Sequence, residues 1–120
     1  MKCANRERFN IIQIEDPEPL DRLEEICALP GLDMIFFGPA DFSQGIGDPN
    51  NMSNPKLIET RKRVAELARK YGKAAGTTGS SETLQARMDE GYNFINVGAD
   101  VVGLAPYYKH VFDETIGKIR

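Results

Sequence analysis

The sequence Met34-Ile-Phe-Phe-Gly-Pro-Ala-Asp41 gives the clearest indication of the fold. Its apolar start, Met34 to Phe37, has the length of a buried strand, roughly 4–8 residues. Gly38 and Pro39 then turn the chain and bring Asp41 just beyond the strand. A loop rich in glycine and asparagine is expected from Gly38 to about Ser53. The stretch therefore predicts a strand that ends in a polar turn.

The residues before this strand predict another strand and a helix. Residues 9–15, Phe-Asn-Ile-Ile-Gln-Ile-Glu, are an apolar-rich run of strand length. Pro17 and Pro19 interrupt that run and open a helix, which Pro30 is expected to end. The apolar residues of this helix recur at helical spacing, at Leu20, Leu23 and Ile26.

A long helix is predicted after the glycine-rich loop. Asn54 and Pro55 are suited to its N-cap and first position, and Gly72 to its C-terminal stop. Its buried face is expected at a spacing of four and three residues, at Leu57, Arg61, Val64, Ala68 and Tyr71.

The rest of the chain continues the alternation. Strands are predicted at residues 74–78 and 94–97, and a last helix at residues 107–119. The helix between these strands is expected to be capped by Ser80 or Ser81 and to end at Gly91.

Strands that alternate with helices in this way are typical of an α/β fold with a parallel sheet. Two architectures agree with the pattern, a small doubly wound sheet and four units of a (β/α)8 barrel. The length of the chain favours the doubly wound sheet, because a full barrel needs about 250 residues. The polar residues at the strand ends favour the barrel units.

Composition and charge narrow the classes of protein to consider. A chain of 120 residues can form one domain with its own core, over residues 1–120. A net charge of -3 gives no reason to expect a nucleic acid or an anionic membrane as partner. No apolar run approaches the roughly 18 residues of a membrane span, and residues 1–8 lack the apolar centre of a signal peptide. Besides Cys3, the chain has Cys27 on an apolar helix face, which predicts a buried free thiol and a cytoplasmic protein.

Polar side chains at the ends of the first two strands predict a binding site. Because strand side chains alternate between faces, Gln13 and Glu15 point to one face, and Ile12 and Ile14 point to the helices. Ligands of parallel α/β folds bind at the carboxyl ends of strands, where Glu15 and Asp41 would meet if the strands are neighbours. Two carboxylates repel unless a cation or proton lies between them, and such oxygen ligands suit Mg²⁺ or Mn²⁺. The alternatives are a solvated strand end and an Asx-type turn at Asp41.

These motifs resemble the HpcH/HpaI aldolase/citrate lyase family, whose class II aldolases act on 2-oxo acids. The resemblance covers residues 9–105. It rests on Gln13-Ile-Glu15, followed about one βα unit later by Pro-Gly-Leu-Asp at residues 30–33 and by Gly38-Pro-Ala-Asp41-Phe-Ser43, and on residues 71–76 and 91–100.

The resemblance implies a half-barrel, the last four βα units of a (β/α)8 barrel. It implies that Glu15 and Asp41 bind a divalent cation, Mg²⁺, Mn²⁺ or Co²⁺. It also implies that the substrate, a small 2-oxo acid, is bound by Gln13 and by a turn that comprises Gly38, Pro39, Ala40 and Asp41. The implied function is that of an aldolase, a carbon–carbon lyase for hydroxylated 2-oxo acids that works through a metal-stabilised pyruvate enolate.

The chain also departs from the family pattern. In the family, four βα units precede the Gln-x-Glu strand and supply a catalytic histidine and an arginine, so no catalytic residue is assigned in this chain. Its single histidine, His110, matches no family motif and is expected on the surface or in helix packing. Asp16 stands where the family usually has threonine, and strand parity directs it away from the site.

A half-barrel has two unpaired sheet edges and an uncovered inner face. We therefore expect this chain to form a homo-oligomer or to dock with a complementary half-barrel. A second hypothesis is a non-catalytic truncated half, or a subunit of a split enzyme, that keeps the metal and oxo-acid site. A third is a citrate-lyase-like or phosphoenolpyruvate-type lyase, which the Gly-Pro-Ala-Asp turn favours less. A rearranged open sheet is the alternative fold.

Overall fold

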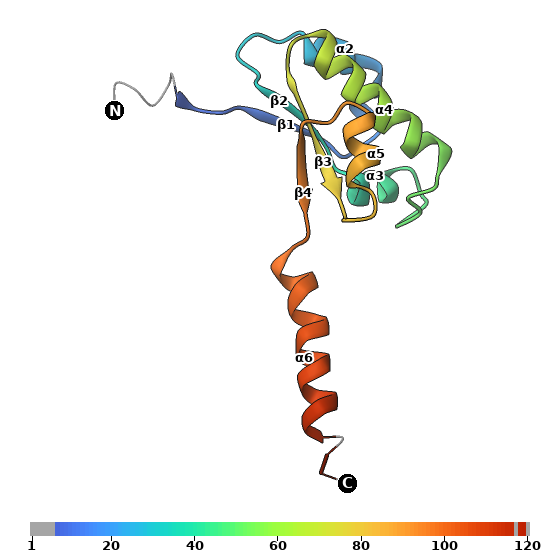
Figure 1. Ribbon diagram of the computed structural model, residues 1–120. Helices are drawn as coiled ribbons and strands as arrows, with labels where there is room; N and C mark the ends of the chain where they lie inside the picture. Colours follow the sequence, from blue (N-terminus) through green and yellow to red (C-terminus); the bar gives the residue numbers. More distant parts are fainter. Residues whose placement is uncertain (1–6, 117, 120) are drawn as a thin grey trace.

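The computed structural model describes residues 7–116, 118 and 119, and it has an α/β fold around one parallel sheet (Figure 1). Neighbouring strands are parallel and lie side by side in chain order. The predicted parallel α/β sheet is confirmed, and the doubly wound alternative, whose strand order reverses, is excluded. The strands of the described residues are β1 (Ile11–Ile14), β2 (Met34–Phe37), β3 (Ala74–Gly79) and β4 (Phe94–Val97).

Helices connect the strands along one face of the sheet, and a last helix, α6, follows β4 (Figure 1). They are the 3₁₀ helix η1 (Glu18–Arg22), α2 (Leu23–Cys27), α3 (Pro39–Gly45), α4 (Pro55–Lys70), α5 (Leu84–Asp89) and α6 (Asp100–Ile116). The long helix α4 packs across β2 and β3, and Figure 1 shows α2 and α5 on the same side of the sheet as α4. The single helix predicted after Pro19 is divided into η1 and α2, and β1 is shorter than the predicted residues 9–15.

The core lies between this helical layer and the sheet. The predicted face of α4 is confirmed, since Leu57, Val64 and Ala68 are fully buried and Tyr71 packs against the core from its edge. The thiol of Cys27 is buried and free, as predicted, whereas Cys3 lies outside the described residues. Further core side chains come from every layer of the fold, among them Ile14, Leu23, Ile35, Phe37, Phe42 and Ala75.

The ends of α4 are formed as predicted. The side-chain oxygen of Asn54 accepts a hydrogen bond from the Lys56 N–H at 2.9 Å, and Gly72 leaves the helix with φ at +66°. Arg61, on the buried face, donates hydrogen bonds of 2.8 and 2.7 Å from Nε and Nη2 to the carboxylate of Glu90. Arg87 donates a further bond of 2.7 Å to the same carboxylate, which ties α4 to the end of α5.

Helix α3 corrects the loop that was predicted from Gly38. Pro39 is its first residue, where the fixed φ of proline suits a helix and its missing N–H costs nothing. Phe42 is fully buried, and its ring centroid lies 5.2 Å from that of Phe37. Such tertiary packing, which local sequence does not reveal, stabilises helices too short to persist alone.

Two other helix starts also differ from the prediction. Helix α5 begins at Leu84 instead of at Ser80 or Ser81, because the Ser80 N–H donates to Oγ1 of Thr83 at 2.8 Å and the intervening residues form a turn. Helix α6 begins at Asp100 instead of at residue 107, and Pro106 lies inside it. The acidic Asp100 lies in the first turn of α6, where a negative charge is favourable beside the helix N-terminus.

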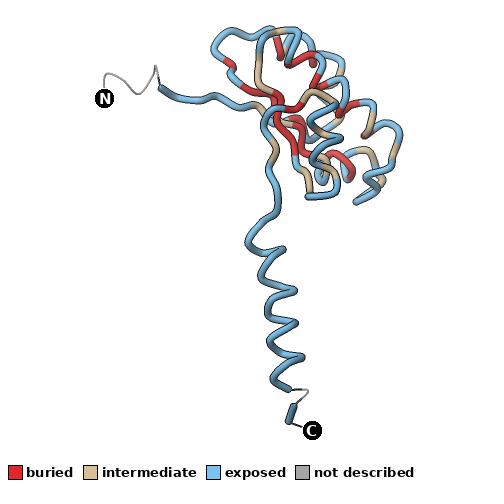
Figure 2. The backbone as a smooth tube through the Cα atoms, in the orientation of Figure 1, coloured by how far each residue is buried: buried red, intermediate tan, exposed pale blue. Residues whose placement is uncertain are grey.

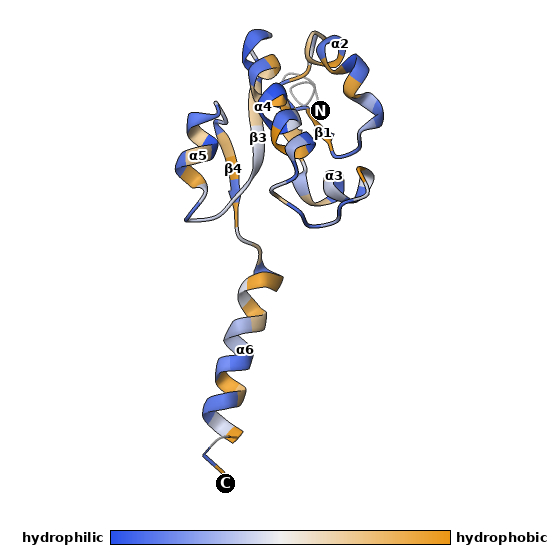
Figure 3. Cartoon of the chain, turned by 90° about the vertical axis from the view of Figure 1, so that its right-hand side faces the viewer, coloured by the Kyte–Doolittle hydropathy of each residue, from blue (hydrophilic) through white to orange (hydrophobic). Residues whose placement is uncertain are grey.

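The second face of the sheet carries no helix in the described part of the chain (Figure 1). On it Ile11 and Phe94 are 46% and 48% exposed. Helix α6 extends away from the sheet, and none of its described side chains is buried (Figure 2). Figure 3 shows that this exposed helix has apolar stretches, which comprise Val101, Val102, Leu104, Tyr107, Tyr108, Val111, Phe112 and Ile116. Among the residues described, no helix combines the length and the apolar character needed to cross a membrane.

Candidate functional site

The end of β1 presents Gln13 and Glu15 to the uncovered face of the sheet. Both side chains are exposed, whereas Ile14 is buried against the helices and Ile12 is half-buried on the same side. The alternation predicted from the sequence is therefore confirmed. The Gly38 N–H donates to the Ile14 carbonyl at 2.9 Å, so β1 and β2 remain paired up to the rim of the sheet.

Gln13, Glu15 and Gly38 pack together at this rim. Nε2 of Gln13 donates a hydrogen bond of 2.6 Å to Oε2 of Glu15. A Cβ atom at Gly38 would lie 2.8 Å from Nε2 of Gln13 and 3.1 Å from Cβ of Glu15. The absence of a side chain at Gly38 thus gives the amide and the carboxylate the room that they occupy.

Asp41 follows in the first turn of α3. Gly38 is the N-cap residue of the helix and has no side chain to cap it. Asp41 lies within the first turn and is exposed, so it is not the N-cap of an Asx-type turn. The N–H groups of Ala40 and Asp41 belong to the first turn, where backbone donors have no partner within the helix. Oγ of the buried Ser43 donates to the Ala40 carbonyl at 2.6 Å and accepts the Asn50 N–H at 2.8 Å, which holds the turn in place.

The carboxylates at this rim are compatible with a divalent cation. Among the described residues, no three histidine, cysteine, aspartate or glutamate side chains gather as a closed metal site. Glu15 and Asp41 offer oxygen ligands only, and such a pair leaves coordination positions for water and substrate, as Mg²⁺ prefers. Asp16 has a different role, because its Oδ1 accepts a hydrogen bond from the Glu18 N–H at 2.8 Å and so holds the start of η1. These side chains have the donor chemistry that Mg²⁺ prefers, and the cation site itself stays a prediction.

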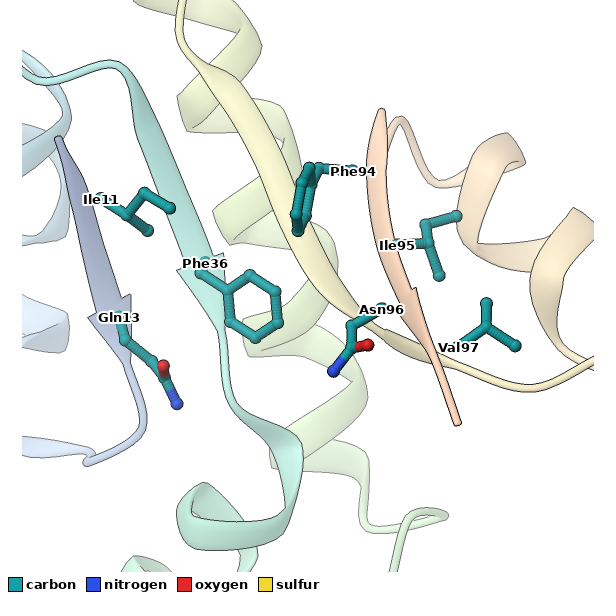
Figure 4. A pocket seen from close by; sticks show the side chains of 7 residues that line it. All are labelled: Ile11, Gln13, Phe36, Phe94, Ile95, Asn96 and Val97. Carbon is teal, nitrogen blue, oxygen red and sulfur yellow. The ribbon is translucent and has the colours of Figure 1, made fainter. Parts of the chain in front are cut away.

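A groove of about 420 Å³ continues from Gln13 across the uncovered face (Figure 4). Its floor is the ring of Phe36, which lies over Gly76, since a Cβ there would be 2.5 Å from the ring. Phe94 meets Phe36 edge to face, with ring centroids 6.4 Å apart. Gln13 borders the groove on β1, and Asn96 borders it on β4.

Sequence reasoning did not single out Phe36, Phe94 or Asn96 for this groove. The sequence signal that could have indicated the groove is Asn96, a polar residue in an apolar strand that faces the same side as Phe94. His110, in contrast, is exposed on α6, which is the first of the two positions expected for it, on the surface or in helix packing.

Comparison with known proteins identifies a family and several relatives that match most of this chain. A family model described as HpcH/HpaI aldolase/citrate lyase matches residues 2–106. A hydroxypyruvate/pyruvate aldolase of Roseovarius nubinhibens is 35% identical over 103 residues, which are 85% of this chain and 40% of that protein. A 2-keto-3-deoxy-L-rhamnonate aldolase of Escherichia coli is 34% identical over 114 residues, 92% of this chain and 40% of the relative. The chain thus spans about 40% of the length of the curated relatives that it matches.

The fold is similar to that of a solved structure of the same family. A crystal structure of an HpcH/HpaI aldolase/citrate lyase family protein from Burkholderia cenocepacia superposes with a TM-score of 0.85 and 29% identity. The superposition covers 94% of this chain and 44% of that structure. Sequence and fold agree, and the chain belongs to the HpcH/HpaI aldolase/citrate lyase family.

Proposed function

We propose that this chain carries the metal- and oxo-acid-binding part of an aldolase that cleaves or builds hydroxylated 2-oxo acids. The observation that carries the proposal is the packing of Gln13 and Glu15 over Gly38, with Asp41 in the next helical turn. The names of the relatives, pyruvate and 2-keto-3-deoxy-L-rhamnonate aldolases, support the same class of reaction.

Each residue of the rim has a role in this proposal. Glu15 and Asp41 hold Mg²⁺, Mn²⁺ or Co²⁺, which when bound supplies positive charge beside the substrate oxygens. The N–H groups of Ala40 and Asp41 donate to the carboxylate of the 2-oxo acid, on the turn shaped by Gly38 and Pro39. Gln13 uses one amide hydrogen for Glu15 and keeps a second for the substrate.

The reaction is redox-neutral. In cleavage, the C3–C4 bond of a 4-hydroxy-2-oxo acid breaks, and its electron pair passes toward the 2-oxo group. The C4 hydroxyl gives its proton to a base and becomes an aldehyde, and C3 takes up a proton to form pyruvate. The residues assigned in this chain bind and orient the substrate, and we assign the base to the segment that completes the site.

We further propose that residues 1–120 form one domain, equivalent to the last four βα units of a (β/α)8 barrel. The chain order of the strands and the single helical layer support this view, since both are features of barrels. The uncovered face would then be the barrel interior. A complementary half-barrel or further copies of this chain would cover it. The buried free thiol of Cys27 supports the cytoplasmic location in this proposal.

A second candidate function follows from the 40% of the relatives' length that this chain spans. A chain that binds the cation and the oxo acid without the base would be a non-catalytic half, or one subunit of a split enzyme. The two candidates predict the same ligands and differ in turnover.

Calorimetric titration of Mg²⁺ or Mn²⁺ in the presence of pyruvate or oxalate tests the site, and an aldolase assay on the same sample tests turnover. We expect Glu15→Gln and Asp41→Asn each to weaken cation binding roughly tenfold or more, because each removes a charged ligand. Asp16→Asn is the matched control, since this carboxylate serves the η1 turn and its variant should bind as the parent does.

The outcomes separate the proposals. Binding with turnover supports the aldolase, and binding without turnover supports the non-catalytic half. Unchanged affinity in both variants, or no binding by the parent chain, would overturn the assignment of the site.

A further inference from the structure

Asn96 places an amide on an otherwise apolar strand face. Figure 4 shows its side chain on the groove side of β4, together with Phe94, whereas Ile95 and Val97 point the other way. Asn96 is exposed on this face. An amide among aromatic rings costs free energy once water is excluded, unless a hydrogen-bond partner meets it.

The strand register puts Asn96 on the same level as the rim site. The pairing of β1, β2 and β3 runs up to the residues just before Glu15, Gly38 and Thr78, so these positions continue one row across the sheet. Thr78 pairs directly with Asn96. Because neighbouring strands are about 4.8 Å apart, the row from Glu15 to Asn96 spans roughly 14 Å.

The two residues in the middle of this row have little or no side chain above the sheet. Gly38 has no side chain and Thr78 has a short one, while the amides of Gln13 and Asn96 flank the Phe36 ring (Figure 4). A ligand whose carboxylate lies at the β1–β2 rim can therefore extend along the row toward β3 and β4. Its far end would then meet Asn96, with the Thr78 hydroxyl beside it.

We infer that Asn96 determines substrate specificity, by hydrogen bonding to a hydroxyl group at the end of the 2-oxo acid remote from its carboxylate. This inference rests on the proposed function, which sets the direction in which the substrate lies. A hydroxyl both donates and accepts, as the amide does, so the two groups are matched. An alkyl end would leave the amide without a partner, and the site therefore selects hydroxylated over alkyl 2-oxo acids.

A pair of uncleavable ligands tests the inference on the full chain with Mg²⁺ present. The probes are 5,6-dihydroxy-2-oxohexanoate and 2-oxohexanoate, which share the carboxylate end and lack the 4-hydroxyl needed for cleavage. The measured quantity is the ratio of their dissociation constants by calorimetry. We expect the parent chain to prefer the dihydroxy acid about fivefold, the effect of one net hydrogen bond. In Asn96→Val, whose side chain suits an exposed strand, the ratio should fall to about one.

Gln85→Ala is the matched control, because it removes an exposed amide from α5, away from the groove, and should keep the parent ratio. A parent ratio near one, or a ratio that Asn96→Val retains, would overturn the role of Asn96 while leaving the proposed function standing. Failure of both acids to bind would instead overturn the proposed function, and the inference with it.

Discussion

At the scale of single residues, the lack of a side chain at Gly38 controls the geometry of Gln13 and Glu15 at the rim. Gly38 lies beneath Gln13 and Glu15, and a methyl group there would come within 2.8 Å of the Gln13 amide. That amide is the free end of a flexible side chain, so it can move aside without unfolding the protein. We predict that Gly38→Ala keeps the fold but breaks the bond that orients Glu15, and weakens Mg²⁺ binding roughly tenfold in calorimetry.

Gly103→Ala is the control for this substitution. Gly103 lies in α6, and a Cβ there meets no atom within 4 Å. Its variant should bind Mg²⁺ as the parent chain does. Parent-like binding by Gly38→Ala as well would show that the bond between Gln13 and Glu15 does not position the cation ligand.

Glu90 is the residue whose ionisation contributes most clearly to stability. Burial raises the pKa of Glu90, but hydrogen bonds from Arg61 and Arg87 outweigh it, and the net pKa lies below the usual 4.5. A carboxyl group with a lowered folded-state pKa stabilises the fold fully above its unfolded pKa. That stabilisation is lost as the pH falls from 4.5 through the lower folded value.

We predict that Glu90→Gln lowers the free energy of unfolding at pH 7 by about 1.5–3 kcal/mol, the value of hydrogen bonds to a charged group. The variant should also lose less stability than the parent between pH 4.5 and lower pH, in urea denaturation. Glu25→Gln is the control, because its pair with Arg22 is 68% and 76% exposed and should change stability by less than about 1 kcal/mol. Equal acid sensitivity of parent and Glu90→Gln would refute the assignment.

At the scale of elements, the sequence predicted best where local signals and packing agree. Helix α4 has an asparagine cap, an apolar stripe and a glycine stop, and its predicted bounds are confirmed. Helix α3 has no such stripe, and it is held by the contact of Phe42 with Phe37 of β2 and by the hydrogen bonds of the buried Ser43. Helix α6 begins earlier than predicted, at Asp100 instead of residue 107, and it includes Pro106.

The cap of α4 can be tested by itself. Oδ1 of Asn54 accepts the Lys56 N–H, and its Nδ2 donates to Asp48 at 2.7 Å, which joins the helix to the preceding loop. We predict that Asn54→Ala lowers the free energy of unfolding by about 1 kcal/mol in urea denaturation. Asn54→Ser restores the acceptor and should recover most of this loss. Equal losses in the two variants would mean that the bond to Asp48, instead of the cap, accounts for the effect.

At the scale of the whole molecule, strand parity and strand order decide how much of the site the sequence reveals. Gln13 and Glu15 could be assigned to one face because alternation along a single strand is a local property. That Asn96 shares a row with Glu15 depends on the register of β3 against β4, which no local pattern specifies. The contributions of β1 and of the turn after β2 were therefore predictable, and the far wall of the groove was not.

The exposed apolar surfaces of the sheet and of α6 predict that the chain associates with itself. The uncovered sheet face carries Ile11 and Phe94, and α6 exposes apolar side chains along its length, including Tyr108 and Phe112. Such contiguous surfaces mark sites of association. We predict that light scattering at micromolar concentration gives a mass of at least two chains, and that Phe112→Lys with Tyr108→Lys lowers this mass.

Glu114→Lys, a charge change at an exposed position of the same helix, should leave the mass as it is in the parent chain. Circular dichroism of each variant separates loss of association from loss of the fold. A dimer that persists after both lysine substitutions would show that Tyr108 and Phe112 are dispensable for association, and the same test would then be applied to Ile11 and Phe94 on the sheet face. A parent chain that is a monomer throughout the micromolar range would mean that neither surface associates with a second copy, and would leave a complementary half-barrel as the partner to seek.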